Sequence, residues 1–317
     1  MEKKSSVITV DHLTKRYKDI VAVNDVSFAV QPGEILGILG PNGSGKTTTL
    51  KSILGIVHYD EGHIEINGLE HRKNREYLMR HAGAVLEGNR NVYWYLSPRE
   101  NLEYFAGIKG LSVKMIKSRM DMLLSMLELT DVAEKTVREF SRGMQQKVAI
   151  ACAFIHDPTL LFLDEPTLGL DVETTRAIKV LLKKVVAEEK KTIIVTSHDM
   201  RFIEDVCDRV LIINKGRIIS HETVASLKSS YALRTMKIVT ASPLTEAQQY
   251  ALSQVDACNI ELFENGHRII TGLKKPSLIY DLIDVLRREN SVIQSIDIEE
   301  DNLEDIFVNL IHSEEEK

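Results

Sequence analysis

Residues 35–48 read ILGILGPNGSGKTT, and this stretch decides the fold. Within it, residues 40–47 match the pattern G-x-x-x-x-G-K-[ST] without a mismatch. The apolar run 35–39 predicts a short strand buried on both faces of a parallel sheet. Residues 48–56 carry apolar side chains at helical spacing, which predicts that a helix follows. A loop of this pattern between a strand and a helix is typical of a phosphate-binding site.

The residue types in this loop suit a bound nucleoside triphosphate. Its glycines have no Cβ, so backbone N–H groups and the helix N-terminus can point at an anion. Lys46 would place a charge at the β- and γ-phosphates, and the Thr47 hydroxyl could ligate Mg²⁺. The alternative is a glycine-rich turn that precedes a lysine by chance. The nucleotide contacts expected here are Gly40, Pro41, Asn42, Gly43, Ser44, Gly45, Lys46, Thr47 and Thr48.

The composition of the 317 residues is that of an ordinary globular protein, with 44% hydrophobic and 27% charged side chains. A net charge of -6 does not favour a nucleic-acid partner or an anionic membrane surface. No apolar run reaches the length of about eighteen residues that spans a bilayer, and the N-terminus lacks a signal-peptide core. We therefore expect a cytoplasmic protein. Cys152, Cys207 and Cys258 lack the spacing of a zinc site or a disulfide framework.

The N-terminal segment alternates apolar and polar side chains. Over residues 8–30 the period is two, which predicts antiparallel strands that cover an edge of the main sheet. Pro32 and Gly33 would turn the chain into the strand before the loop. Tyr17 lies between these strands, where its ring could stack on a purine or simply be half exposed on a strand. Taken alone, the sequence favours the second interpretation.

A helical stretch interrupts the strand pattern. Residues 63–68 and 82–86 read as two further strands. Ser97 and Glu100 then have the spacing of a capping box at a helix start. We expect a helical insert over about residues 97–145. A second helix within it is indicated by apolar side chains at helical spacing, namely Ile116, Met120, Leu123, Leu124 and Leu127.

Two acidic residues follow a buried strand. Residues 160–163 are apolar throughout, and Asp164 and Glu165 come directly after them. In a chain with a phosphate-binding loop, this strand end is where an aspartate that orders Mg²⁺ is needed. Residues 192–196 predict another buried strand that ends beside His198. A histidine there would lie on the ligand-binding edge of a parallel sheet, although a purely structural role is an equal alternative.

The last third of the chain has a different pattern. A hairpin at residues 210–219 closes a first domain, which we expect to span residues 1–222. Residues 223–317 then predict a small α+β accessory domain with the order β-α-β-β-α-β. Asn265-Gly266 has the composition of a hairpin turn, and residues 314–317 read as a solvated tail. We find no catalytic pattern in this domain.

The order of these motifs resembles that of the ATP-binding subunits of ABC transporters. The most discriminating stretch is FSRGMQQK, residues 140–147, which is similar to the family signature LSGGQ and keeps Ser141 and Gly143. Gly169-Leu170-Asp171 resembles the family's D-loop. The resemblance spans nearly the whole first domain. It implies an α/β P-loop NTPase core with an antiparallel β edge subdomain and the helical insert.

The resemblance also implies a mechanism that needs two copies of the chain. The copies would pair head to tail around ATP and Mg²⁺, so that residues 40–48 of one face Ser141 and Gly143 of the other at the γ-phosphate. Tyr17 would then stack on adenine, which reverses the preference given above. Asp171 would lie at this interface too. The remaining roles implied are Mg²⁺ binding by Asp164 with Thr47, activation of the attacking water by Glu165, and γ-phosphate contacts from His198 and Lys46.

The chain departs from the family pattern at three positions. Glu87 stands where the family has a Gln that reaches the metal and senses the membrane subunit. We therefore treat Glu87 as a further candidate contact to nucleotide and metal. Arg142 replaces a Gly of the signature, and Met144 replaces its Gln. Arg142 could contact phosphate or the other copy, although the sequence favours a solvated side chain.

The accessory domain, with residues 302–307 near its end, is similar to the extension on ATPases that serve drug, antibiotic and peptide exporters. This resemblance implies an ATP-hydrolysing subunit that drives export through a separately encoded polytopic permease. We expect the permease to hold it at the inner face of the cell membrane, with no nucleic-acid partner. Two alternatives stay open. One is a soluble ABC ATPase of translation or DNA repair, and the other is a nucleotide-binding regulator with low turnover, suggested by Glu87 and Arg142.

Overall fold

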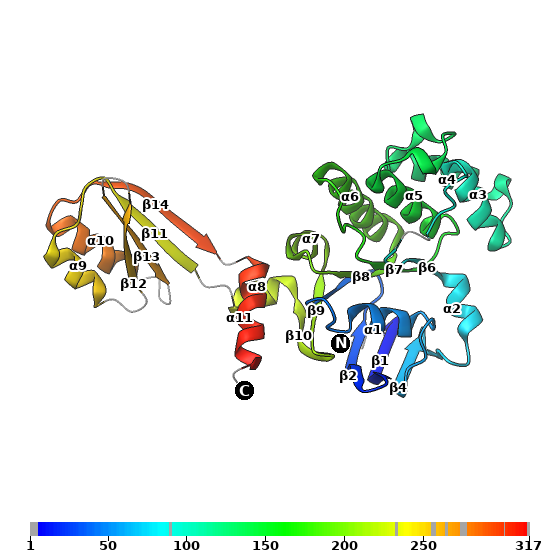
Figure 1. Ribbon diagram of the computed structural model, residues 1–317, viewed down its shortest axis with the longest axis horizontal. Coiled ribbons are helices and arrows are strands. Elements are labelled where there is room, and N and C mark those ends of the chain that lie inside the picture. The colour runs from blue at the N-terminus through cyan, green and yellow to red at the C-terminus, as the bar shows by residue number, and fades with distance from the viewer. Residues whose placement is uncertain are drawn as a thin grey trace. The chain divides into compact units, whose positions relative to one another are not determined.

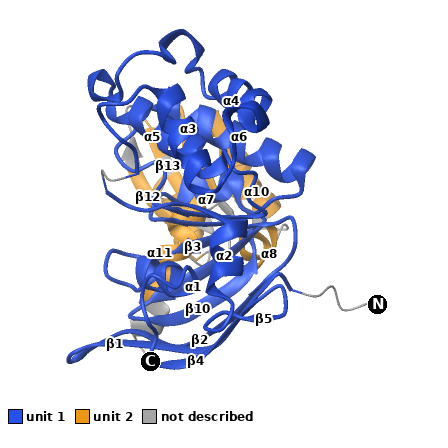
Figure 2. Cartoon of the chain, turned by 90° about the vertical axis from the view of Figure 1, so that its right-hand side faces the viewer, with its two compact units in different colours: residues 1–224 blue, residues 225–317 orange. Residues whose placement is uncertain are grey.

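The computed structural model describes residues 6–88, 91–231, 234–254, 258–263, 266–272, 278–300 and 302–315. The chain divides into two compact units, residues 1–224 and 225–317 (Figure 2). Among the described residues, no helix has both the length and the hydrophobicity needed to cross a bilayer.

A six-stranded sheet forms the centre of unit 1 (Figure 1). Five of its strands are parallel, and β10 pairs antiparallel with its neighbour β9, as the hairpin prediction requires. Strand β3 is buried along its whole length, since helices or the second sheet cover both faces. The carboxyl ends of its parallel strands therefore share one edge. The strands lie in the order β10 (Arg217–Thr223), β9 (Arg209–Asn214), β3 (Ile35–Leu39), β8 (Thr192–Ser197), β7 (Leu160–Asp164) and β6 (Ala82–Val85).

The N-terminal strands pair in a second, antiparallel sheet. Its order is β2 (Ile20–Val30), β1 (Ile8–Tyr17), β4 (Glu61–Ile66) and β5 (Leu69–Glu70). Helix α1 (Lys46–Ile53) packs between this sheet and the six-stranded sheet, and its Leu50 and Ile53 belong to the same hydrophobic core as both (Figure 1). The second sheet thus fixes the helix that begins at the phosphate-binding loop.

The helical stretch between β6 and β7 contains the capping box that its sequence predicts. The Ser97 hydroxyl accepts a hydrogen bond from the Glu100 backbone N–H, and the Glu100 carboxylate accepts one from the Ser97 N–H at 2.7 Å. This capping box starts α3. The apolar face of α4 is buried, while Met115, off that face, is 68% exposed. The helices of unit 1 beyond α1 are α2 (Arg75–His81), α3 (Pro98–Ile108), α4 (Val113–Met126), α5 (Arg142–Phe154), α6 (Val172–Glu189) and α7 (Met200–Val206), with 3₁₀ turns at Thr130–Val132 and Val137–Glu139.

Unit 2 contains an antiparallel sheet in the order β12-β13-β11-β14, with a core around Met236, Ile238 and Leu282. Two helices were not predicted. These are α8, which starts at the boundary between the units, and α11, which reaches Glu315 where we expected a solvated tail. Asn265 of the proposed turn and residues 316–317 lie outside the described residues. The elements are α8 (Val224–Tyr231), β11 (Arg234–Thr240), α9 (Glu246–Ser253), β12 (Cys258–Phe263), β13 (Gly266–Gly272), α10 (Leu278–Arg288), β14 (Ile293–Glu300) and α11 (Leu303–Glu315).

His156, just after α5, connects the end of this helix to β6. Burial lowers the pKa of His156 to about 4. Its Nε2 lies 3.1 Å from the Ala82 carbonyl oxygen of β6, which requires the ring N–H to donate. Since the unfolded chain binds a proton near pH 6.5 and the folded chain does so only near pH 4, acid favours unfolding within this window.

We predict that the free energy of unfolding of unit 1 falls as the pH is lowered from 6.5 to 4, and that H156Q makes this fall smaller. Glutamine can still donate to Ala82 but does not titrate. Urea unfolding followed by fluorescence of Trp94, the one tryptophan of the chain, measures it. H63N is the control, because the side chain of His63 is 46% exposed and pairs with Glu65, whose side chain is exposed to the same extent. A pH dependence unchanged in H156Q would contradict the prediction.

Candidate active site

The phosphate-binding loop joins β3 to α1. Gly43 and Gly45 have φ of 80° and 108°, a region that L side chains rarely adopt. A Cβ on Gly45 would lie 2.4 Å from the Ala22 carbonyl oxygen, and one on Gly40 would lie 2.2 Å from the Ile213 carbonyl oxygen. Glycine is thus required at residues 40 and 45 because the loop lies close to β2 and β9, and it is favoured at residue 43 by the positive φ alone.

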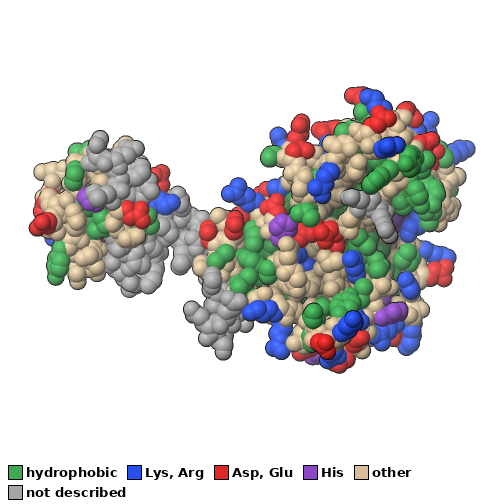
Figure 3. All heavy atoms as spheres, in the orientation of Figure 1, with side chains coloured by type: hydrophobic (Ala, Val, Ile, Leu, Met, Phe, Trp, Pro, Cys, Tyr) green, Lys and Arg blue, Asp and Glu red, His purple; other side chains and the backbone are tan. Residues whose placement is uncertain are grey.

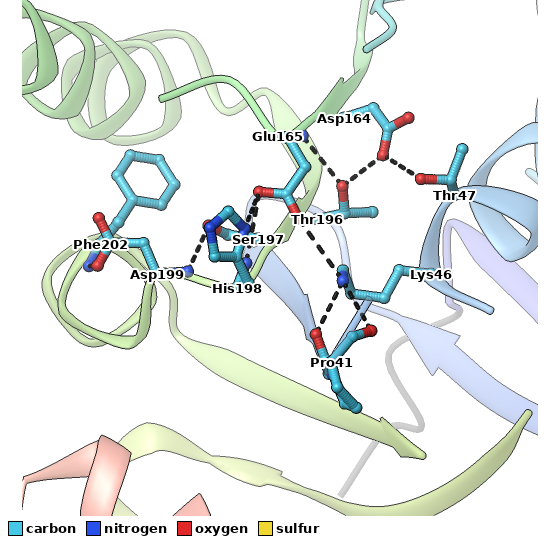
Figure 4. A network of polar contacts seen from close by, with 11 residues as sticks. Pro41, Lys46, Thr47, Asp164, Glu165, Thr196, Ser197, His198, Asp199 and Phe202 are labelled. Carbon is cyan, nitrogen blue, oxygen red and sulfur yellow. Dashed lines mark hydrogen bonds and ion pairs between the residues drawn. The ribbon is translucent and has the colours of Figure 1, made fainter. Parts of the chain in front are cut away.

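Lys46 is held by its own loop. Its Nζ donates to the carbonyl oxygens of Gly40 at 2.8 Å and Pro41 at 3.3 Å, and lies 3.6 Å from Glu165 Oε1 (Figure 4). Only 6% of the side chain is exposed. The ammonium group therefore keeps three oxygen partners at the place where a phosphate would be bound.

Asp164 ends β7 and is almost fully buried. One carboxylate oxygen, Oδ1, accepts from Thr47 Oγ1 at 2.9 Å and from Thr196 Oγ1 at 2.6 Å (Figure 4). The other, Oδ2, is buried without a hydrogen-bond partner among the described residues. A buried carboxylate oxygen without a donor is costly, and it is a ligand that Mg²⁺ prefers. Asp164 and Thr47 therefore fit a magnesium ion that completes its coordination with phosphate oxygens and water.

Glu165 lies between the lysine and the histidine. Its φ of 49° turns the chain sharply at the strand end, and its N–H donates to the Thr196 hydroxyl and carbonyl oxygens, each at 3.1 Å. The carboxylate reaches Lys46 through Oε1 and lies 2.9 Å from His198 Nδ1 through Oε2. The side chain of Glu165 is 7% exposed, whereas that of His198 is 47% exposed. The Glu165 carboxylate is thus largely buried, and its histidine partner faces the open side.

A cleft of about 490 Å³ brings most candidates together. Tyr17 lies on its wall, 45% exposed, with Lys15 Nζ 5.1 Å from the ring centroid. The carbonyls of Gly40 and Pro41 hold Lys46 and are not part of the lining. Residues that line the cleft are Tyr17, Ala22, Asn42, Gly43, Ser44, Gly45, Lys46, Thr47, Thr48, Glu87, Glu165, Leu168 and His198.

The Ser-Gly turn lies outside this cleft. Ser141 is the N-cap of α5 and accepts from the Met144 N–H at 3.2 Å. A Cβ on Gly143 would lie 2.7 Å from Thr174 Oγ1, so α5 and α6 approach closely there. Asp171 caps α6, and the hydrogen bond from the Thr174 N–H lowers the pKa of its carboxyl group. Ser141, Gly143 and Asp171 gather in one region but do not meet Lys46 within the same chain.

Sequence reasoning missed Thr196. It is fully buried, donates to Asp164 and accepts from the Glu165 N–H. The sequence analysis treated Thr196 only as the last residue of an apolar strand, because threonine is common in strands. Its position two residues before His198, on a strand next to β7, could have indicated that it belongs to the site. Leu168, which lines the cleft, was missed as well.

Comparison with known proteins places this site in a family. The family model described as ABC transporter matches residues 23–168. The ABC transporter ATP-binding protein NatA of Bacillus subtilis is 34% identical over 75% of this chain and 98% of its own length. This chain belongs to the ABC transporter ATP-binding proteins. The resemblance inferred from the motifs is therefore confirmed, and the protein binds ATP and is an ATPase.

Other relatives extend the match to the whole ATPase chain. The bacitracin transport ATP-binding protein BcrA of Bacillus licheniformis is 33% identical, covering 97% of this chain and 98% of its own. The linearmycin resistance ATP-binding protein LnrL of B. subtilis is 31% identical, covering 96% and 98%. A solved dimeric ATP-binding cassette in a post-hydrolysis state with ADP and Pi superposes with a TM-score of 0.63 at 29% identity, covering 68% of this chain and 98% of that cassette. The predicted fold class is confirmed.

We predict that T196V lowers the free energy of unfolding of the ATPase by about 1–3 kcal/mol, because Asp164 loses a buried donor. The rate of ATP hydrolysis should fall with it, since the Glu165 N–H loses an acceptor. Urea unfolding and a phosphate-release assay measure the two effects. T196S, which keeps the hydroxyl, is the control. A T196V variant with wild-type stability would contradict the importance of this network.

Proposed function

We propose that the ATPase works as a head-to-tail homodimer that powers export of a small molecule, antibiotic or peptide through a separately encoded membrane permease. The observation that carries the dimer is the split site. Lys46, Glu165 and His198 line one cleft, while the Ser141 turn lies outside it. The names of the relatives BcrA and LnrL, which match along nearly the full chain, support the export of an antibiotic-like cargo.

The α5 N-terminus is suited to bind a phosphate supplied across the dimer. The first N–H groups of a helix have no intrahelical acceptor and carry partial positive charge. In this chain one of them is used by the Ser141 hydroxyl. Gly143 adds no side chain that would block an approaching anion. The turn of one copy would thus complete the cleft of its partner from the side opposite Lys46.

The chemistry within each completed site follows from the contacts. Mg²⁺, when bound, neutralises phosphate oxygens, and we assign Asp164 and Thr47 to hold it. Glu165 accepts the proton of the attacking water, and His198, at hydrogen-bond distance from Glu165, orients that base and reaches the γ-phosphate. Lys46 exchanges its loop carbonyls for phosphate oxygens. The Tyr17 ring stacks on the adenine, and the Glu87 carboxylate approaches the metal from β6.

An exposed aromatic surface offers the permease a docking site. We define it as Tyr93, Trp94, Tyr95, Tyr104 and Ile108, which are between 42% and 77% exposed. Figure 3 shows hydrophobic side chains gathered over this part of unit 1, around α3. Such a patch is typical of an interaction site on a protein that otherwise buries its large apolar side chains.

Buried hydrogen bonds hold the backbone beneath this surface in one conformation. Asn101 is fully buried, and its side chain bonds the Tyr93 N–H at 2.7 Å, the Tyr93 carbonyl at 3.0 Å and the Ser97 carbonyl at 2.9 Å. The hydroxyl groups of Tyr93 and Tyr104 lie 2.9 Å apart. A surface that is already ordered loses little conformational entropy when a partner binds.

We predict that E165Q with Mg-ATP forms a stable dimer, because ATP closes the pair and cannot be hydrolysed to release it. Light scattering at matched concentrations measures the mass. The same variant with S141R should stay monomeric, since the added side chain blocks the turn. K46A should abolish hydrolysis. A monomeric E165Q protein saturated with Mg-ATP would rule out the sandwich.

We predict that Y95A/I108A lowers recovery of a polytopic membrane protein with the tagged ATPase from solubilised membranes, while ATP hydrolysis by the purified chain is unchanged. The matched control is Y250A/Y280A, which removes two exposed tyrosines of unit 2. Co-sedimentation with ribosomes or DNA, without a membrane partner, would instead favour the soluble ATPase of translation or repair.

A further inference from the structure

Arg142, the first residue of α5, packs on the loop that follows Glu165. Its Nη1, Cζ and Nη2 atoms lie 3.4, 3.7 and 3.8 Å from the point that a Cβ on Gly169 would occupy. These similar distances mean that the guanidinium group lies over this glycine. Gly169 has a φ of 70°, so its place in the turn also favours a residue without a side chain. The next residue of α5, Gly143, packs on Asp171 and Thr174. The start of α5 thus contacts the loop 165–171 at two points.

Arg142 also faces a group of carboxylates. A second cavity of unit 1, of about 170 Å³, is lined by Glu87, Asp164 and Glu165 from the strand ends and by Arg142 from α5. Among the described residues of its wall, Arg142 is the one cation. Apart from these four residues the described part of the lining is uncharged, and it includes Gln145, Gln146 and Trp94. The guanidinium is therefore a positive charge on the same wall as these acids, and Lys46 pairs with Glu165 from the other cleft.

The two charged departures from the family pattern meet at this cavity. Glu87 replaces a neutral amide and Arg142 replaces a glycine, and the two side chains carry opposite charges. Together they leave the net charge of the wall as it would be with glutamine and glycine. Glu87 alone would add a third negative charge beside Asp164 and Glu165, which opposes the binding of a triphosphate anion.

We propose that Arg142 is a positioning residue for ATP hydrolysis within its own chain. It offsets the charge of Glu87 across the cavity and holds the loop 165–171, so that the Glu165 carboxylate keeps its place. This rests on the role of Glu165 proposed above. In this proposal Ser141 and Gly143 contact the phosphate bound by the partner, whereas Arg142, in the same turn, acts on Glu165 of its own chain.

A double-mutant cycle tests the proposal on ATP hydrolysis by the purified full chain. We expect R142A to lower kcat about tenfold, with the KM for ATP changed less than about threefold, because the loss falls on positioning. In an E87Q background, R142A should cost less than about threefold, since the charge that Arg142 offsets is gone. R142K should recover about half of the loss on a logarithmic scale, because it restores charge without the flat contact on Gly169.

R80A is the matched control, since Arg80 is an exposed arginine on α2 that pairs with Glu76. It should leave kcat unchanged in both backgrounds. A urea midpoint equal to that of the wild type establishes that a variant folds. If R142A does not fold, R142K is compared with the wild type instead. An R142A loss of equal size in both backgrounds, an R142K as inactive as R142A, or an R142A within twofold of wild type would each overturn the proposal. This cycle measures ATP hydrolysis by the purified chain, so it can be interpreted even if E165Q fails to dimerise or no permease is found. The failure of the proposed function and the failure of the Arg142 proposal are therefore distinguishable.

Discussion

The buried carboxylate of Asp164 is the constraint on which the ATP site depends. An ionised group in a protein interior must be given hydrogen bonds, and here both donors are hydroxyls on the same oxygen, from α1 and from β8. Those bonds fix the spacing between the phosphate-binding loop, β7 and β8. The second oxygen has no donor among the described residues. The chain alone therefore carries a cost at this point that a bound cation would remove, which would link cation binding to the stability of the strand ends.

Lys46 is a second buried charged group whose hydrogen-bond partners determine the structure of the site. An ammonium group with 6% exposure needs acceptors whether or not nucleotide is present. The carbonyls of Gly40 and Pro41 and the carboxylate of Glu165 supply them in the free chain. When phosphate oxygens replace these partners, Lys46 is desolvated no further, and Glu165 loses its cation. Nucleotide binding would thus change the surroundings of Glu165, the proposed general base, by removing the Lys46 contact.

Much of this arrangement could be predicted from sequence, because parallel strands bring their carboxyl ends to one edge. That rule alone places Lys46, Asp164, Glu165 and His198 together. Thr196 could not be found in this way, since a threonine in a strand reads as a strand former whether or not its hydroxyl has a task. The cavity shared by Glu87 and Arg142 was also out of reach, because it depends on how α5 packs against the loop 165–171. Helix α11 was missed because the acidic residues at the end of the chain predict a solvated tail. Its apolar residues Leu303, Ile306 and Phe307 are nevertheless buried.

The two cavities of unit 1 share three residues, Glu87, Glu165 and Leu168. One cavity is lined by the phosphate-binding loop, and the other by Trp94 of the exposed aromatic surface. A coupled change between distant sites requires an element whose arrangement both sites bias. The short segments that carry Glu87 and Leu168 are placed to serve as such elements, because each lines both cavities. In the proposed dimer a second copy completes the phosphate contacts, so both cavities would constrain these segments most tightly in the closed pair. In the proposed exporter, that closed pair is the state that would act on the membrane permease.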